Sequence, residues 1–428
     1  MNPLTEVTAD TAAAAAAPAP RTPVSYESLA ERFRPIFARI ADGANAREQQ
    51  HQLPFAEIQL LADAGFGALR VSVAEGGSGA TLPQLFRLLT ELAAADSNIP
   101  QALRGHFAFV EDRLVASGTA RSLWLERFVA GDLVGNSWTE IGAVTVGEVN
   151  TKVTPSPDGN PAEFRVNGRK FYSTGSIFAD WVDTYAQRTD TGAHVIAVVN
   201  ARQSGVTHGD DWDGFGQRTT GSGTSTFVDA VVAAENVIDF STRFAYQTAF
   251  YQAVLLAVLA GSIQAAVREV STEVRNRTRI FTHGNTDAFA TDPQILQVVG
   301  EASAQGFAAA ATLESAAQAL QHAHDAAFVD DAGEENRLND LAELATAQAQ
   351  VVLSELATRA TSTIFNALAA SGVSTSKNLD RHWRNARTAA NHNPWVFKAR
   401  IVGDYEVNAT PPVRIWAIGN ARTTPAAL

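Results

Sequence analysis

The chain of 428 residues contains no cysteine. Disulfide bonds, thiolate nucleophiles and cysteine-ligated metals are therefore excluded, and no metal site is predicted. The lack of cysteine fits a cytoplasmic protein, which is the location we expect. Residues 1–24 have no basic segment followed by a continuous apolar core with a cleavage site. They predict a disordered arm rich in alanine and proline, and not a signal peptide.

Positive charge is also scarce, because 33 lysines and arginines face 45 aspartates and glutamates, for a net charge of −12. The summed field of such a chain repels phosphate, so nucleic acid and anionic membranes are not expected partners. The longest uncharged run covers residues 244–267, but polar side chains interrupt it. A membrane-spanning helix needs about 20 predominantly apolar residues, so we predict a helix buried inside a bundle.

Three regions follow one another along the chain. Residues 25–133 carry apolar side chains at helical spacing, although Pro35 predicts a kink or a restarted helix. Residues 134–240 consist of short β-branched and aromatic runs separated by turn sequences, which is typical of an antiparallel β domain. Residues 241–428 are helical again. The fold class is therefore α+β, mainly α, with an N-terminal helical domain, a central antiparallel β-barrel domain and a C-terminal helical bundle with a tail.

One stretch near the C-terminus runs against the overall charge. RHWRNARTAANHNPWVFK, residues 381–398, combines arginines, a lysine, histidines and two tryptophans and contains no carboxylate. Nucleic acid or an anionic cofactor could explain such a cluster, and the acidic chain favours the cofactor.

Three segments of the β region resemble the acyl-CoA dehydrogenase superfamily: SWTEIGAV at its entry, VNGRKFYSTGSIFADW inside it and TSTFVDAVVAAENVI at its exit. The resemblance covers about residues 25–410. It implies a flavin between the β domain and the C-terminal bundle. It also implies a homotetramer, in which partner subunits help to hold the cofactor.

The dehydrogenases of that superfamily need a carboxylate to remove a proton from the substrate. Neither segment that usually carries it, RNARTAANHNPW or residues 244–267, contains one. Instead, LDRHWRNARTAANHNP is similar to the flavin-dependent monooxygenase branch of the superfamily, typified by dibenzothiophene monooxygenase. That group often has a histidine where Ala389 stands and an aspartate where Asn393 stands, so the resemblance leaves the substrate open.

The resemblance implies a monooxygenase that uses FMNH2 and O2, through a flavin C4a-hydroperoxide, to oxygenate a small aromatic or sulfur-containing substrate. FAD is a possible cofactor in place of FMN. No G-x-G-x-x-G fingerprint follows a predicted strand, so a separate NAD(P)H:flavin reductase is expected to supply the reduced flavin. The alternatives are an FAD-dependent acyl-CoA dehydrogenase with a displaced base, and a flavin-fold binding protein without activity.

By the same resemblance, His392 is the leading catalytic candidate and His106 the second, since histidine titrates near neutral pH. Either could instead be a structural histidine. The arginines are proposed to contact flavin phosphate, although Arg275 or Arg277 could replace Arg279, and Arg384 and Arg387 could be salt-bridged structural residues. The predicted cofactor-binding residues are Thr139, Ser173, Thr174, Trp212, Arg279, Phe281, Arg384 and Arg387.

Overall fold

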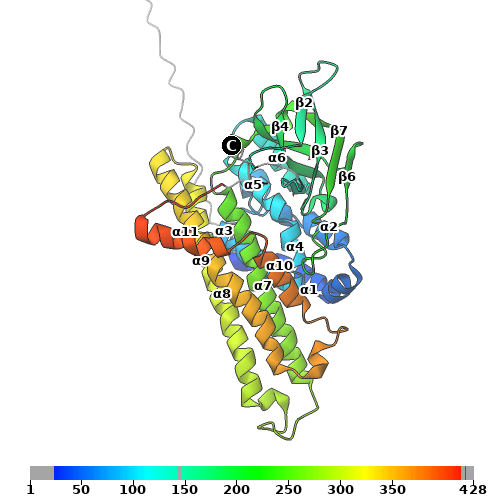
Figure 1. The fold of residues 1–428 in the computed structure, drawn as a ribbon, viewed down its shortest axis with the longest axis vertical. Helices are drawn as coiled ribbons and strands as arrows, with labels where there is room; N and C mark the ends of the chain where they lie inside the picture. The colour runs from blue at the N-terminus through cyan, green and yellow to red at the C-terminus, as the bar shows by residue number, and fades with distance from the viewer. Residues whose placement is uncertain (1–23, 143–145, 416–419, 421–428) are drawn as a thin grey trace, which may run out of the picture.

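A computed structural model describes residues 24–142, 146–415 and 420 of the chain. The predicted N-terminal arm therefore lies outside the described residues, except for Val24. The molecule is elongated, with a sheet domain at one end of a long helical bundle and the N-terminal helices packed beside both (Figure 1).

The N-terminal region is helical, as predicted. Its α-helices are α1 (Tyr26–Gln50), α2 (Phe55–Asp63), α3 (Leu82–Ala95), α4 (Asn98–Ala102), α5 (Arg104–Val115) and α6 (Thr119–Ala130). Thr81 and Gln84 form a capping box that starts α3. The restarted helix expected at Pro35 is not found, because α1 runs through this residue as one helix. Pro35 is exposed, so water can satisfy the carbonyl that loses its helical donor.

The central region is one curled sheet, and its strand order is β6-β7-β3-β2-β4-β5-β8, with β1 paired to β4. Its strands are β1 (Val134–Ser137), β2 (Lys152–Pro155), β3 (Glu163–Lys170), β4 (Trp181–Arg188), β5 (His194–Asn200), β6 (Val206–His208), β7 (Ser225–Ala233) and β8 (Val237–Asp239). The prediction of a purely antiparallel domain is wrong in one respect, since β1 and β2 both run parallel to β4. Turn sequences indicate hairpins between consecutive strands, whereas a parallel pair needs a crossover that leaves no local signal.

The C-terminal region consists of α7 (Gln247–Asn276), α8 (Pro293–Ala326), α9 (Ala332–Thr363), α10 (Arg381–Ala390) and α11 (Val396–Asn408). Among the described residues, α7 alone is long and apolar enough to cross a membrane, and 89% of its most apolar window is buried inside the protein. It lies in the middle of the bundle against α3, α8, α9 and α10. The predicted buried helix is therefore confirmed.

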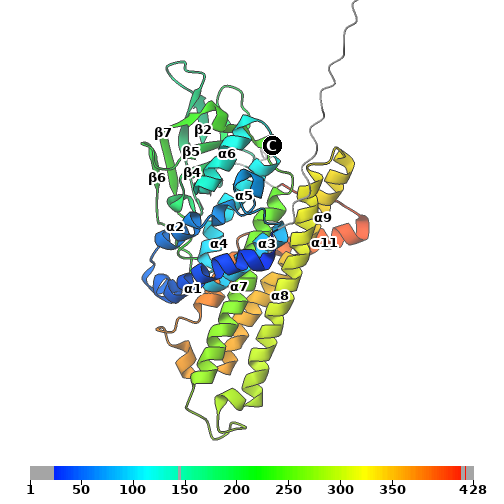
Figure 2. The same ribbon diagram turned by 180° about the vertical axis from the view of Figure 1, so that it is seen from behind.

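Helix α5 joins the three regions. It packs on α7 and on β1, and from both sides of the molecule it is seen between the sheet domain and the upper end of the bundle (Figures 1 and 2). Its Glu111 is fully buried and receives hydrogen bonds from Arg70 (2.6 Å) and from the hydroxyl of Tyr246 (2.9 Å), which precedes α7. His324 of α8 lies 3.3 Å from the same carboxylate. This buried cluster connects the N-terminal helices to the bundle.

Candidate active site

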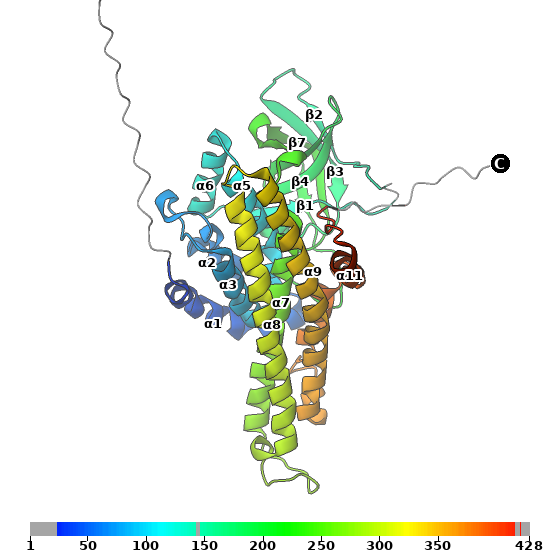
Figure 3. The same cartoon turned by 90° about the vertical axis from the view of Figure 1, so that its left-hand side faces the viewer.

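A cavity of about 500 Å³ lies where α5, the sheet and α7 meet. Helix α7 contributes one face of its first turns, because Gln247, Thr248, Tyr251 and Gln252 recur at the spacing of a single helix face. Figure 3 shows α7 rising toward the end of the sheet where β1 and β4 lie, with α9 and α11 in front of it and beside it. The remaining lining residues are Arg104, Asn136, Trp138, Thr139, Glu140, Gly147, Glu148, Val149, Lys170, Tyr185, Phe240, His392, Asn393 and Ile415.

The wall on the sheet side is rigid. The indole nitrogen of Trp138 donates to Asp183 (2.7 Å), and its ring packs edge-on against Phe240 and Tyr251. Lys170 lies 2.7 Å from Glu140, whose carboxylate also accepts from the backbone amides of Asn150 and Thr151, just before β2. Burial lowers the pKa of Lys170 to about 8 although Glu140 opposes the shift. Because both carboxylate oxygens of Glu140 are engaged, it is a structural group of the wall.

The opposite wall contains His392 and Arg104, whose Nε2 and guanidinium nitrogen lie 2.9 Å apart. A guanidinium can only donate, so Nε2 of His392 accepts and its ring is neutral. His392 is exposed as a residue, but its ring lies against protein atoms, and this packing and the cation of Arg104 both lower the pKa of His392 well below its ordinary value. The expectation that His392 titrates near neutral pH is therefore wrong. In this geometry the proton of the neutral ring is on Nδ1, and the side chain of Asn393 is a further hydrogen-bond partner of the ring.

Of the ten predicted site residues, the structure brings His392 and Thr139 to this cavity. His106 is not among them, because its Nε2 donates to the carbonyl of Gly67 (2.9 Å) and its Nδ1 accepts from the amide of Val134 (3.2 Å). It follows Arg104 by two residues on α5, which turns it about 200° away from the cavity. Its pKa falls to about 4 through burial. We assign His106 a structural role.

Ser173, Thr174 and Trp212 have hydrogen-bond partners that do not line the cavity. The hydroxyl of Ser173 is 3.0 Å from that of Ser137, and the hydroxyl of Thr174 is 2.8 Å from that of Ser222. The indole nitrogen of Trp212 donates to the carbonyl of Gly216 within its own loop (3.2 Å). None of the three lines the cavity in the described chain.

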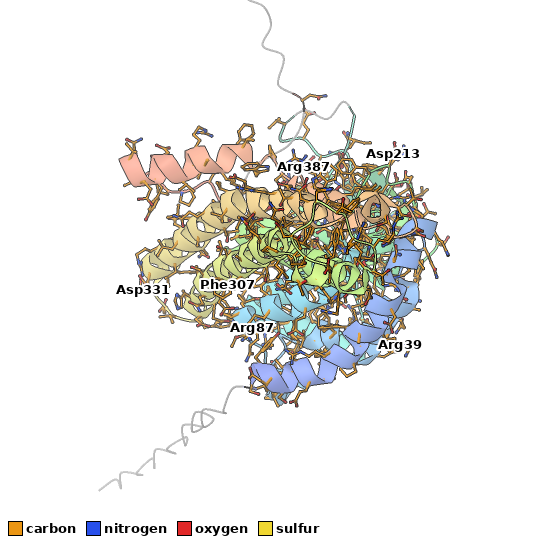
Figure 4. All side chains as sticks on the ribbon, turned by 90° about the horizontal axis from the view of Figure 1, so that it is seen from below. Arg39, Arg87, Asp213, Phe307, Asp331 and Arg387 are labelled. Carbon is orange, nitrogen blue, oxygen red and sulfur yellow. The ribbon has the colours of Figure 1, made fainter. Side chains whose placement is uncertain are left out.

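The predicted arginines also lie elsewhere. Arg384 forms ion pairs with Glu48 and Asp380, as a structural arginine does. Arg387, labelled in Figure 4, is partly buried on α10 and is not among the lining residues.

Arg279 and Phe281 are exposed in the loop between α7 and α8, at the end of the bundle opposite the sheet (Figure 1). Helix α7 places that loop roughly 35 Å from the cavity, at 1.5 Å per residue. Arg279 of one chain therefore does not reach the cavity of the same chain.

Several lining residues escaped the sequence analysis. Arg104 stands in the RGHFAF segment beside the histidine that the resemblance favoured. Tyr251 and Gln252 stand in the run predicted to form a helix buried on nearly all sides. The polar side chains within the apolar run of α7 were a sequence signal for a site. That they share a cavity with Arg104 follows only from the packing of α5 on α7.

The cavity suits a flat aromatic cofactor with polar edges. Five buried polar atoms on its walls have no hydrogen-bond partner: Nε of Arg104, Oδ1 of Asn136, the hydroxyl oxygen of Tyr251 and the amide oxygens of Gln247 and Gln252. Such atoms call for a ligand or water, and the aromatic rings beside them can cover a planar ring system. Within the described ranges, no group of three or more His, Asp or Glu side chains could hold a metal ion.

Helices, a curled sheet and a helical bundle around a cavity of this kind define a flavoenzyme architecture, and the family comparisons agree. The acyl-CoA dehydrogenase N-terminal domain matches residues 26–132, and the acyl-CoA dehydrogenase C-terminal domain matches residues 253–396. The chain belongs to the acyl-CoA dehydrogenase family.

Several of its relatives come from the monooxygenase branch. A probable FMNH2-dependent monooxygenase, SfnC of Pseudomonas putida, is 26% identical over 89% of this chain and 94% of the relative. Dibenzothiophene monooxygenase of Mycolicibacterium goodii is 27% identical over 81% and 86%. FMN-bound TdsC of Paenibacillus sp. A11-2 superposes with a TM-score of 0.81 at 26% identity, covering 90% of this chain and 98% of the other. The predicted resemblance to dibenzothiophene monooxygenase is confirmed.

Proposed function

We propose that the protein is an FMNH2-dependent monooxygenase that uses O2 to oxygenate a small organic substrate. The observation that carries this proposal is the composition of the cavity wall formed by α7 and by the segment after α10. These elements contribute glutamines, a threonine, a tyrosine, a histidine and an asparagine, and no carboxylate. A base able to remove a proton from an acyl thioester is absent from both of them, which disfavours the acyl-CoA dehydrogenase alternative.

Reduced FMN supplies the two electrons with which one atom of O2 enters the substrate and the other leaves as water. In this chain Asn136 and Thr139 would hold polar edges of the flavin ring, and Trp138 would cover part of its surface. The neutral ring of His392 can donate from Nδ1 to oxygen, while the aromatic wall keeps water out.

We further propose a two-component system in which a separate NAD(P)H:flavin reductase delivers the reduced FMN. The absence of a dinucleotide-binding fingerprint in the sequence supports this proposal. A cytoplasmic location follows as an expectation, because such a reductase works where its nucleotide is available.

A homotetramer is the proposed assembly. Large apolar side chains are exposed along the bundle, among them Leu296 (51%) and Phe307 (79%) on α8 and Val352 (42%) on α9. Phe307 is labelled on α8 in Figure 4. Large apolar patches on a surface mark protein interfaces. The exposed loop with Arg279 lies at the end of the bundle opposite the sheet. In a tetramer, Arg279 would reach a flavin phosphate bound to a neighbouring subunit.

The test combines the purified protein with FMN, a flavin reductase, NADH and O2. We expect tight binding of reduced FMN, and oxygen consumption that yields product with dibenzothiophene or another sulfur-containing or aromatic compound from a panel. A protein that purifies with FAD, and whose FAD is bleached anaerobically by an acyl-CoA, would instead be a dehydrogenase.

A further inference from the structure

Arg104 differs from the other buried arginines of the described chain. Five of the six are paired with carboxylates: Arg47, Arg70, Arg113, Arg243 and Arg381. Arg104 is 5% exposed and has no carboxylate partner. Its contacts are the neutral ring of His392 and the ring face of Tyr251, with 5.1 Å between the guanidinium carbon and the ring centroid.

A buried cation without a counter-charge is unfavourable, because the protein interior solvates a charge much less well than water does. Burial accordingly lowers the pKa of Arg104 to about 10, and Tyr251 is the one side chain that acts against this shift. An arginine remains charged at neutral pH even so. The part of the wall formed by Arg104, His392 and Tyr251 therefore carries one positive charge without an ion-pair partner, and the Nε–H of Arg104 has no acceptor.

The surroundings of Arg104 would accept more than a bare ion. Gln252 also lines the cavity, and its amide oxygen has no partner. Exchanging the oxygen and nitrogen of such an amide turns the free position into a donor. Tyr251 and Trp138 provide an apolar surface next to these polar groups. A small organic molecule with an anionic oxygen group matches this surrounding, because its oxygens would meet the polar groups and its carbon skeleton the apolar surface.

We infer that the substrate of this monooxygenase carries an oxyanion, a carboxylate or a sulfur oxyanion, and that Arg104 recognises it. This inference rests on the proposed function. Guanidinium suits the role because its donors form a planar fork that matches two oxygens at once. Arg104 is thus a specificity-determining residue, and the reacting atom of the substrate lies elsewhere on the molecule.

Matched pairs of ligands test the inference by direct binding, without turnover. Isothermal titration of the FMN-loaded protein would compare acetate with acetamide, benzoate with benzamide, and benzenesulfinate with methyl phenyl sulfone. We expect at least one anion to bind about tenfold or more tightly than its neutral counterpart. A preference in the acetate or benzoate pair would identify a carboxylate as the recognised group, and a preference in the sulfinate pair would identify a sulfur oxyanion. The acetate pair tests a substrate that is too small to contain an aromatic ring. The absence of a preference in all three pairs would refute the inference.

Three variants assign the preference to a residue. Arg104→Gln should reduce anion binding about 10²-fold and change binding of the neutral counterpart less than about threefold. Arg104→Lys keeps the charge and should retain part of the preference. Arg39→Gln is the control, because this substitution removes the same formal charge. Arg39 is exposed on α1, which contributes no residue to the cavity lining, and it is labelled in Figure 4. A preference that survives in Arg104→Gln would overturn the assignment.

The Tm of Arg104→Gln separates recognition from a structural role. We expect the variant to be at least as stable as the parent, because it removes a buried cation without a counter-charge. A large loss of stability, or a failure to fold, would show that the cation is structural and would overturn the inference. Equal weakening of flavin binding with an unchanged ratio of anion to neutral affinity would assign Arg104 to the flavin instead. Reductase-coupled oxygen uptake is measured separately, so a failed monooxygenase assay with intact anion binding counts against the proposed function alone.

Discussion

Replacing Glu111 by glutamine should be among the most destabilising single changes in this chain. Glu111 has no exposed surface and lies between Arg70, Tyr246 and His324. Burial alone would raise its pKa, but Arg70 and His324 outweigh burial and hold the pKa at about 2. Relative to the ordinary value of 4.5, this shift corresponds to about 3 kcal/mol. The variant also leaves Arg70 buried without a counter-charge, so we expect a total loss of about 3–5 kcal/mol at pH 7.

The pH dependence has a definite sign. The folded protein holds Glu111 ionised where the unfolded chain would protonate it, so the contribution is complete above about pH 4.5 and is lost as the pH falls toward 2. The difference in stability between the parent and Glu111→Gln should therefore shrink on acidification over that range.

A second trio in the same helical domain supplies the control. Glu91 accepts hydrogen bonds from Arg34 and Tyr26, but its side chain is 27% exposed and that of Arg34 is 54% exposed. Glu91→Gln should therefore cost only about 0–1 kcal/mol. Urea unfolding of both variants, followed by circular dichroism from pH 3 to 8, measures the difference. If Glu111→Gln proves no more damaging than Glu91→Gln, the reasoning from burial is wrong.

Three further predictions concern the cavity and the bundle. His392→Ala should lower product formed per NADH by roughly 10²-fold while H2O2 accumulates, since the donor to oxygen is lost; full coupling in the variant would refute the role. Glu343 is buried on α9, and burial raises its pKa to about 8. The folded protein therefore keeps a proton that the unfolded chain releases near pH 4.5, so the stability of the folded state falls as the pH rises from 4.5 to 8. Glu343→Gln should remove this slope and stabilise the protein above pH 8 by on the order of 3–5 kcal/mol, as melting temperatures from pH 5 to 9 would show. Arg279→Ala should weaken FMN binding at least tenfold without lowering the Tm, and unchanged FMN affinity by fluorescence titration would exclude Arg279 as the phosphate anchor.

The sequence was sufficient for the elements whose signals are local. The uncharged run that became α7 and the hairpin between β4 and β5 both follow from periodicity and turn residues. The parallel pairing of β1 with β4 depends on two strands separated by a long segment, for which residue patterns carry no information. The class of enzyme came from motifs, and the relatives agree with it.

The site could be predicted only in part, for a similar reason. His392 and Thr139 were found because they belong to continuous motifs. Arg104 and His106 stand in one motif, and the choice between them depends on how α5 is rotated against α7 and the sheet. The motif favoured the histidine, while backbone hydrogen bonds at Gly67 and Val134 turn that histidine inward.

Helix α5 is held along its whole length, by His106 near its start and by Glu111 near its end. A helix fixed in this way cannot slide or rotate to fit a new ligand, so α5 can change the pocket only through the side chain at position 104. A library randomised at this single position would therefore alter which charge the enzyme accepts while the scaffold stays in place. The same rigidity makes α5 a poor target for insertions or loop grafting, and an attractive fixed point for redesign of the facing turns of α7.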